Sequence, residues 1–139
     1  MKRKWQFIFV ILFNGLLSSA GETLSFEETL AAVTQKVEKS GLKVMHIIDH
    51  SKNAKDINLN LPRTTLLLVG NPQVGTQLML QNQQLALELP LKILVTESKD
   101  FKVSVSYRSP IAAMEKQVSG DSLKILEKME GKLKDITHF

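Results

Sequence analysis

The sequence predicts a single compact α+β domain in which about four strands form a mixed or antiparallel sheet packed with helices. Four segments rich in leucine and β-branched residues have the length of strands, and they span residues 42–48, 64–69, 91–95 and 103–107. Other segments carry apolar residues at three- and four-residue intervals, which is the spacing of one helix face. The expected order is helix, strand, strand, helix, strand, strand, helix, helix, and it is typical of one α+β layer domain.

The first helix is predicted from Ser25, which stands three residues before Glu28 in the pattern of a capping box. Its apolar face follows at helical spacing and consists of Phe26, Leu30, Val33 and Val37. The strand over 42–48 comes next, and strict alternation places Val44 and His46 on the same face of it.

The middle of the chain predicts a strand followed by a capped helix. Residues 51–60 are polar and indicate a loop or a short helix before the strand at 64–69. A Gly-Asn-Pro corner then occupies 70–72. Asn71 can cap the helix that follows, and Pro72 suits its first turn, where a missing N–H is tolerated.

The last two predicted strands are joined by the short link Ser98-Lys99-Asp100, which favours an antiparallel hairpin. Ser109 before Pro110 then predicts a further short helix by the same capping logic.

The final helix is predicted from an apolar stripe with charged residues on its other face. The stripe consists of Leu126, Met129, Leu133 and Ile136. Either Ser119 or Asp121 can cap this helix, and Gly131 weakens it by about 1 kcal/mol relative to alanine. The stripe also suits a membrane surface, but the mixed charges favour packing on the sheet.

Residues 1–20 have the pattern of a secretory signal. Lys2, Arg3 and Lys4 precede an apolar run over 7–17, and small residues lead to Ala20. The run is shorter than the roughly 20 residues that span a bilayer. We therefore expect cleavage after Ala20, a single domain over 21–139 and a periplasmic or secreted protein, with an uncleaved anchor as the alternative.

Charge and cysteine content exclude several classes of function. The chain carries 18 basic and 14 acidic residues, and three of the basic ones lie in the signal, which leaves a net charge of +1. No basic stripe remains that would favour nucleic acid. The absence of cysteine excludes disulfides, thiol catalysis, thiolate metal sites and iron–sulfur clusters.

The histidines are the candidate catalytic and metal-binding residues of the sequence. Asp49 and His50 adjoin at a strand end, where His50 could act as a general base. Neighbouring residues of a strand point to opposite faces, so a turn aspartate beside a partly buried histidine is favoured instead. His46 and His50 could hold a metal only with a third ligand such as Asp56 or Glu97, and we expect no metal and no cofactor.

The segment 70–76 has the glycine spacing of a phosphate-binding loop. It lacks the lysine that such a loop carries between the positions of Gly75 and Thr76, so its main charge clamp is missing. The helix start could still bind an anion through free N–H groups, but we favour a structural turn.

Several of these motifs, taken in order, resemble the bacterial domain-of-unknown-function family 302. The matching segments are Ile48-Asp49-His50, Leu61-Pro62, Gly70-Asn71-Pro72, Gly75-Thr76, Leu78-Met79, Leu89 to Val95, and Tyr107 before Pro110. The resemblance covers about 25–114, and it leaves 115–139 as a C-terminal helical extension. It implies a compact α+β domain built on a mixed or antiparallel sheet and compatible with a homodimer, with no agreed activity. If such a domain has a pocket, the matched polar residues are expected to line it: Asp49, His50, Asn71, Thr76, Lys92 and Tyr107.

These observations favour an exported, non-catalytic domain that binds an unknown small ligand or protein partner, as a homodimer. No nucleic acid partner and no stable membrane insertion after signal cleavage are expected. The alternative is a small-substrate enzyme that uses His50 with Asp49 or Tyr107.

Overall fold

Four strands form one antiparallel sheet whose order in space, β1-β2-β3-β4, follows their order in the sequence. The structure is a computed structural model that describes residues 23–139, so the predicted signal at 1–20 lies outside the described residues. The strand bounds are β1 (Lys43–Asp49), β2 (Thr64–Gly70), β3 (Leu91–Glu97) and β4 (Val103–Tyr107). The predicted α+β fold class is confirmed, and of the two predicted sheet types the antiparallel one is present.

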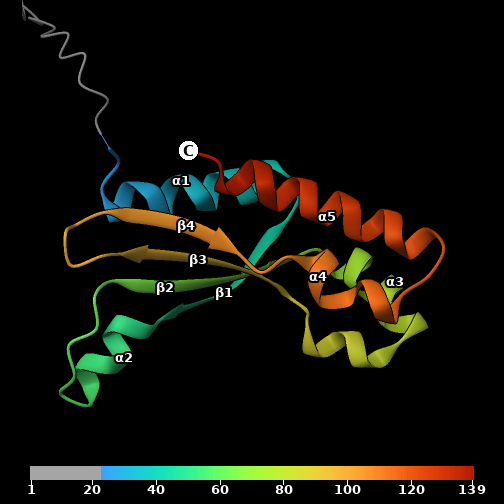
Figure 1. The fold of residues 1–139 in the computed structure, drawn as a ribbon, viewed down its shortest axis with the longest axis horizontal. Coiled ribbons are helices and arrows are strands. Elements are labelled where there is room, and N and C mark those ends of the chain that lie inside the picture. Colours follow the sequence, from blue (N-terminus) through green and yellow to red (C-terminus); the bar gives the residue numbers. More distant parts are fainter. Residues whose placement is uncertain (1–22) are drawn as a thin grey trace, which may run out of the picture.

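Two long helices, α1 (Phe26–Lys39) and α5 (Asp121–Thr137), lie along one face of the sheet (Figure 1). Shorter helices occupy its two ends. Figure 1 shows α2 (His50–Asp56) at one end, between β1 and β2. At the other end are α3 (Pro72–Gln81), the 3₁₀ helix η1 (Gln83–Leu87), α4 (Pro110–Met114) and the 3₁₀ helix η2 (Glu115–Gln117).

Three of the predicted helix starts are confirmed by side-chain caps. The Ser25 hydroxyl accepts from the Glu28 N–H at 3.2 Å, and the Glu28 carboxylate accepts from the Ser25 N–H at 2.8 Å. Asn71 caps α3, and Ser109 caps α4. The start of α5 differs from the prediction, because neither Ser119 nor Asp121 caps it. Gly120 occupies the N-cap at φ 58° and ψ −131°, without a side-chain hydrogen bond.

The core lies between the sheet and the two long helices. Alternate residues of the central strands are fully buried there, namely Leu67, Val69, Ile93 and Val95. The predicted stripe of α5 is buried against them, together with Val33 and Val37 of α1. Because this stripe packs in the core, the prediction of packing is confirmed over the membrane-surface alternative.

The opposite face of the sheet carries a second apolar row, which α1 and α5 do not cover. Ile48, Leu66 and Leu94 are neighbours in register across β1, β2 and β3. They are half-buried and do not belong to the core cluster. We call these three residues, with Leu68 beside them, the outer row.

β1 contains a bulge that the sequence pattern did not reveal. Val44 pairs with Val69 and His46 pairs with Leu68, so Met45 is an extra residue in β1. The prediction that Val44 and His46 share a face is therefore wrong. A bulge re-aims a side chain and changes the alternation beyond it.

Candidate functional site

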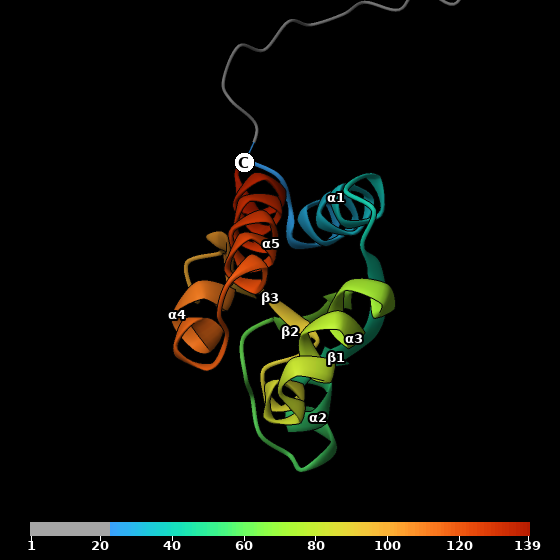
Figure 2. The same ribbon diagram turned by 90° about the vertical axis from the view of Figure 1, so that its right-hand side faces the viewer.

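A concave pocket of about 490 Å³ lies at the end of the sheet where β2 passes into α3. Its walls come from α3 on one side and α5 on the other, and Figure 2 shows both helices at this end of the sheet. The link from η1 to β3 and the first residues of β1 complete it. We call it the α3–α5 pocket.

The floor of the pocket forms where three segments meet at Gly70. A Cβ atom added to Gly70 would lie 3.3 Å from the Met45 sulfur and 3.7 Å from Cβ of Pro90. Glycine therefore lets the bulged residue of β1 and the start of β3 approach the end of β2. Around this point most lining side chains are apolar, including Leu42, Val74, Met79, Leu89, Leu91, Ile125 and Met129.

The polar groups of the pocket are few and include no acid. Asn71, Thr76 and Gln77 line it from α3 and its cap, and Lys128 and Lys132 line it from α5. Within residues 23–139, no aspartate or glutamate contributes to the lining. The pocket therefore combines an apolar interior with amide, hydroxyl and ammonium groups.

The candidate residues predicted from the sequence fall into four separate places. Asn71 and Thr76 line the α3–α5 pocket, and the other four do not. Asp49 and His50 lie at the opposite end of the sheet, because Asp49 pairs with Thr65 at the start of β2. The expected six-residue cluster is not present.

Asp49 serves as the cap of α2. Its carboxylate accepts from the Ser51 hydroxyl at 2.6 Å and from the Lys52 N–H at 2.9 Å. These two hydrogen bonds hold the pKa of Asp49 below its usual range. His50 is exposed as the first residue of α2, and in the described part of the chain no side chain hydrogen-bonds to it. The prediction of a partly buried histidine at this position is therefore wrong, whereas the prediction of a turn aspartate is confirmed. Asp49 thus positions a helix start and does not orient the imidazole.

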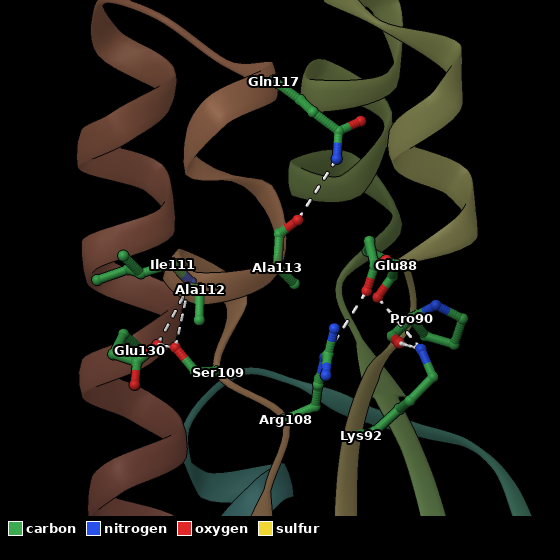
Figure 3. Close-up of polar contacts among 10 residues, drawn as sticks. All are labelled: Glu88, Pro90, Lys92, Arg108, Ser109, Ile111, Ala112, Ala113, Gln117 and Glu130. Carbon is green, nitrogen blue, oxygen red and sulfur yellow. Dashed lines mark hydrogen bonds and ion pairs between the residues drawn. The ribbon is translucent and has the colours of Figure 1, made fainter.

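Lys92 lies on the outer face of the sheet, opposite Leu68. Figure 3 shows its ammonium turned toward the link between η1 and β3. The ammonium donates to the carbonyl oxygens of Glu88 at 3.3 Å and Pro90 at 3.2 Å. Arg108 reaches the Glu88 carboxylate at 3.9 Å. These contacts hold the link between η1 and β3 from the outer face of the sheet, and Leu89 and Pro90 of the same link line the pocket.

Tyr107 belongs to a polar cluster centred on Glu130 of α5. The Glu130 carboxylate accepts from the Tyr107 hydroxyl at 2.8 Å, the Ser109 hydroxyl at 2.7 Å and the Ile111 N–H at 3.4 Å. Figure 3 shows Glu130 facing Ser109 and the start of α4. The cluster joins α5 to the end of β4 and to α4.

The pKa values of this cluster follow from its hydrogen bonds. Burial raises the pKa of Glu130, but the bonds from Ser109, Tyr107 and Ile111 together outweigh it, so the pKa is lowered. The bond to Glu130 raises the pKa of Tyr107. Both shifts favour a charged Glu130 that accepts from a protonated Tyr107, which is a structural arrangement.

Sequence reasoning missed the pocket residues of β1 and α5. Met45 reaches the pocket because of a bulge, and the printed sequence shows no interruption there. Lys128 and Lys132 belong to the charged face of α5, which the sequence presents as a solvent-exposed face. Their spacing of four residues, which places them on one side of the helix, was the available signal.

Residues 23–139 contain neither a metal-ligand cluster nor a membrane-spanning helix. No group of three or more His, Cys, Asp or Glu residues there could hold a metal ion. No helix in that range is both long and apolar enough to cross a membrane.

The fold and the Gly-Asn-Pro corner find a match among known protein families. The profile described as "Domain of unknown function DUF302" matches residues 19–138. The chain belongs to the DUF302 family. The match includes α5, which the sequence had led us to place in an extension beyond the family core.

A solved DUF302 protein shares the fold. The crystal structure of an uncharacterized conserved DUF302 protein from Bacillus stearothermophilus superposes with a TM-score of 0.73. The match covers 82% of this chain and 89% of that one at 16% sequence identity, which supports the fold alone.

Curated relatives match part of the chain. Proteins named fluoride-specific ion channel FluC 1 from Brucella suis and Brucella abortus are 37% identical over 86 residues. The matched segment is 62% of this chain, and it is 34% of the first relative and 32% of the second. The matched segment thus makes up about a third of the length of these relatives.

Proposed function

We propose that this DUF302 domain binds a small organic ligand in the α3–α5 pocket and catalyses no reaction on it. The pocket itself carries the proposal. Its volume of about 490 Å³ lies within the range of roughly 300–1,000 Å³ that ligand pockets occupy. A mostly apolar wall with a few polar groups is also the usual composition of such pockets.

The chemistry of the lining supports binding over catalysis. Its polar groups are an asparagine, a threonine, a glutamine and two lysines. General acid–base catalysis needs a base within hydrogen-bond reach of the reacting proton. His50, Asp49 and Tyr107, the residues of the enzyme alternative, lie outside this pocket, and Asp49 and Tyr107 are engaged in structural hydrogen bonds.

Fluoride is the ion named for the curated relatives, but the size and the lining of the α3–α5 pocket favour a larger ligand. The α3–α5 pocket has a mostly carbon wall and the volume of an organic molecule. We therefore propose an organic ligand for this chain.

Filling the pocket tests the proposed function. A neutral fluorescent probe, N-phenyl-1-naphthylamine, is expected to bind the purified protein with enhanced emission. Ala86→Trp places an indole at an exposed lining position and should reduce probe affinity at least tenfold. Ala31→Trp, at an exposed position of α1 outside the lining, is the matched control and should bind as the parent does. Equal binding by all three proteins would place the probe elsewhere and refute the proposal.

Export is the second part of the proposal and rests on the basic and apolar pattern of residues 1–20. The intact mass of protein recovered from the periplasmic or culture fraction should correspond to a chain that begins at Gly21. Recovery of uncleaved chain in the cytoplasmic fraction would contradict it.

We also propose that two copies of the chain associate through the outer row. Ile48, Leu66 and Leu94 form an uncharged apolar line across three strands. Apolar side chains that no helix of the same chain covers can form an interaction surface, and these three are half-buried. The row itself carries no charge, and Lys92 beside it donates to the Glu88 and Pro90 carbonyls, so an identical row from a second copy can form an isologous contact.

A further inference from the structure

We propose that the ligand of the α3–α5 pocket is an amphipathic organic anion, whose charged group lies at Lys128 and Lys132 and whose apolar body lies over the Gly70 floor. This inference rests on the proposed function and names the class of ligand. It requires a positive rim, cations that are free to pair, and an adaptable apolar wall.

The rim of the pocket carries positive charge that nothing in the lining neutralises. Lys128 and Lys132 stand four residues apart on one side of α5. Two like charges at this spacing repel each other, and an anion between them removes the repulsion. Glu130, the acid between them in sequence, turns instead toward Tyr107 and Ser109.

The two ammonium groups differ in how they are held. Lys132 donates to the Ser40 carbonyl at the C-cap of α1, at 2.6 Å, which fixes this lysine between α5 and α1. An ammonium has three donors, so two remain for a ligand. The Lys128 ammonium makes no hydrogen bond or ion pair with another residue in the described part of the chain. One cation is thus pre-positioned, and the other can move to meet an anion.

The apolar wall is suited to a flexible hydrocarbon body. Met45, Met79 and Met129 all line the pocket, one from each of β1, α3 and α5. Methionine is unbranched and polarizable, so it adapts to an irregular or mobile apolar partner. Leu42 and Leu91 are buried beneath this layer and give it a rigid base.

Three compounds with the same alkyl chain and different head groups distinguish the effect of head-group charge on binding from the effect of the apolar chain. Decanoate, decanol and decylamine are titrated against the full chain by displacement of N-phenyl-1-naphthylamine. Decanoate is expected to bind about tenfold more tightly than decanol, and decylamine more weakly than decanol. Higher salt should reduce the preference for decanoate, because the lysines are exposed.

Variants of the two pocket lysines test whether they cause the preference for decanoate over decanol. Lys128→Gln should lower decanoate affinity several-fold and leave decanol affinity unchanged, and adding Lys132→Gln should remove the remaining preference. Lys132→Gln removes the bond from Lys132 to the Ser40 carbonyl and can lower stability. The single variant Lys128→Gln leaves that bond intact, so it tests the charge preference by itself. Lys124→Gln, on α5 outside the lining, is the control and should keep the preference.

The outcomes distinguish the two proposals. If decanol and decanoate bind equally and Ala86→Trp abolishes both, the pocket binds ligands and the anion inference is wrong. A preference for decanoate that survives both lysine substitutions also overturns it. If none of the three compounds displaces the probe and Ala86→Trp changes nothing, the proposed function itself is wrong.

Discussion

Glu130 ties the C-terminal helix to the end of β4 and the start of α4. It receives three donors from the segment that joins β4 to α4, and through them α5 is fixed above the sheet. The same helix supplies Lys128 and Lys132 to the pocket. The position of the positive rim therefore depends on a carboxylate that points away from it.

We predict that Glu130→Gln lowers the free energy of unfolding at neutral pH by about 1 kcal/mol. The amide keeps one acceptor but loses the charge that strengthens the bonds from Tyr107 and Ser109, and partial exposure limits the loss. Urea unfolding at neutral pH measures the difference. Glu127→Gln, at an exposed position of α5, is the matched control and should change it little.

The pH dependence of this difference has a defined sign. Because the pKa of Glu130 is lowered in the folded protein, its contribution is present above its ordinary pKa. The contribution is lost as the pH falls through the lowered, folded-state pKa. The gap between the parent and Glu130→Gln should therefore stay constant near neutral pH and narrow as the pH falls below the ordinary pKa of a glutamate. A gap that stays constant below that pKa would show that charge on Glu130 is not what stabilises the cluster.

At the scale of elements, the predictable features were those whose cause is local. Ser25, Asn71 and Ser109 cap their helices through bonds to residues two or three positions later, so the residue types reveal them. The start of α5 depends instead on the backbone conformation of Gly120. The sequence suggested a different cap, because Ser119 and Asp121 on either side are both good capping residues. The bulge at Met45 could not be predicted from the sequence pattern of β1, because it arises from how β1 pairs with β2.

Two glycines at α5 should respond in opposite directions to alanine. Gly120 has φ 58° and ψ −131°, a region that is essentially restricted to glycine, so Gly120→Ala should lower stability by about 1–3 kcal/mol. Gly131 lies inside the helix with nothing within 4 Å of an added Cβ, so Gly131→Ala should raise it by roughly 1 kcal/mol.

Thermal unfolding of the two glycine variants beside the parent measures these changes. An added Cβ also has open space at Gly120, so any loss there comes from the backbone alone. If Gly120→Ala is as stable as the parent, the described start of α5 is wrong.

At the scale of the whole molecule, the antiparallel sheet explains why only part of the site was predicted. We expected polar residues at strand ends to meet. In an antiparallel pair the end of one strand lies beside the start of the next, as Gly70 lies beside Lys43 and Asp49 beside Thr65. Asn71 therefore lies at the pocket, whereas Asp49 lies at the opposite end of the sheet. The lysines of α5 joined through tertiary packing that no local pattern encodes.

The outer row predicts a dimer that one charge should disrupt. Leu94→Lys places an ammonium in the apolar line, beside Leu66, and should convert a dimer to a monomer in light-scattering chromatography. Ala31→Lys is a suitable control, because Ala31 is exposed on α1, which lies along the other face of the sheet. A parent protein that is monomeric at all tested concentrations contradicts the proposed association.

The central claim is that the α3–α5 pocket is the ligand site of this DUF302 domain. An NMR titration of the ¹⁵N-labelled protein with decanoate tests it most directly. We expect saturable amide shifts concentrated at the pocket, at Gly70, Gly75, Thr76 and Met129, which Ala86→Trp removes. Shifts confined to the outer row or to α2, or no saturable shift at all, would contradict it.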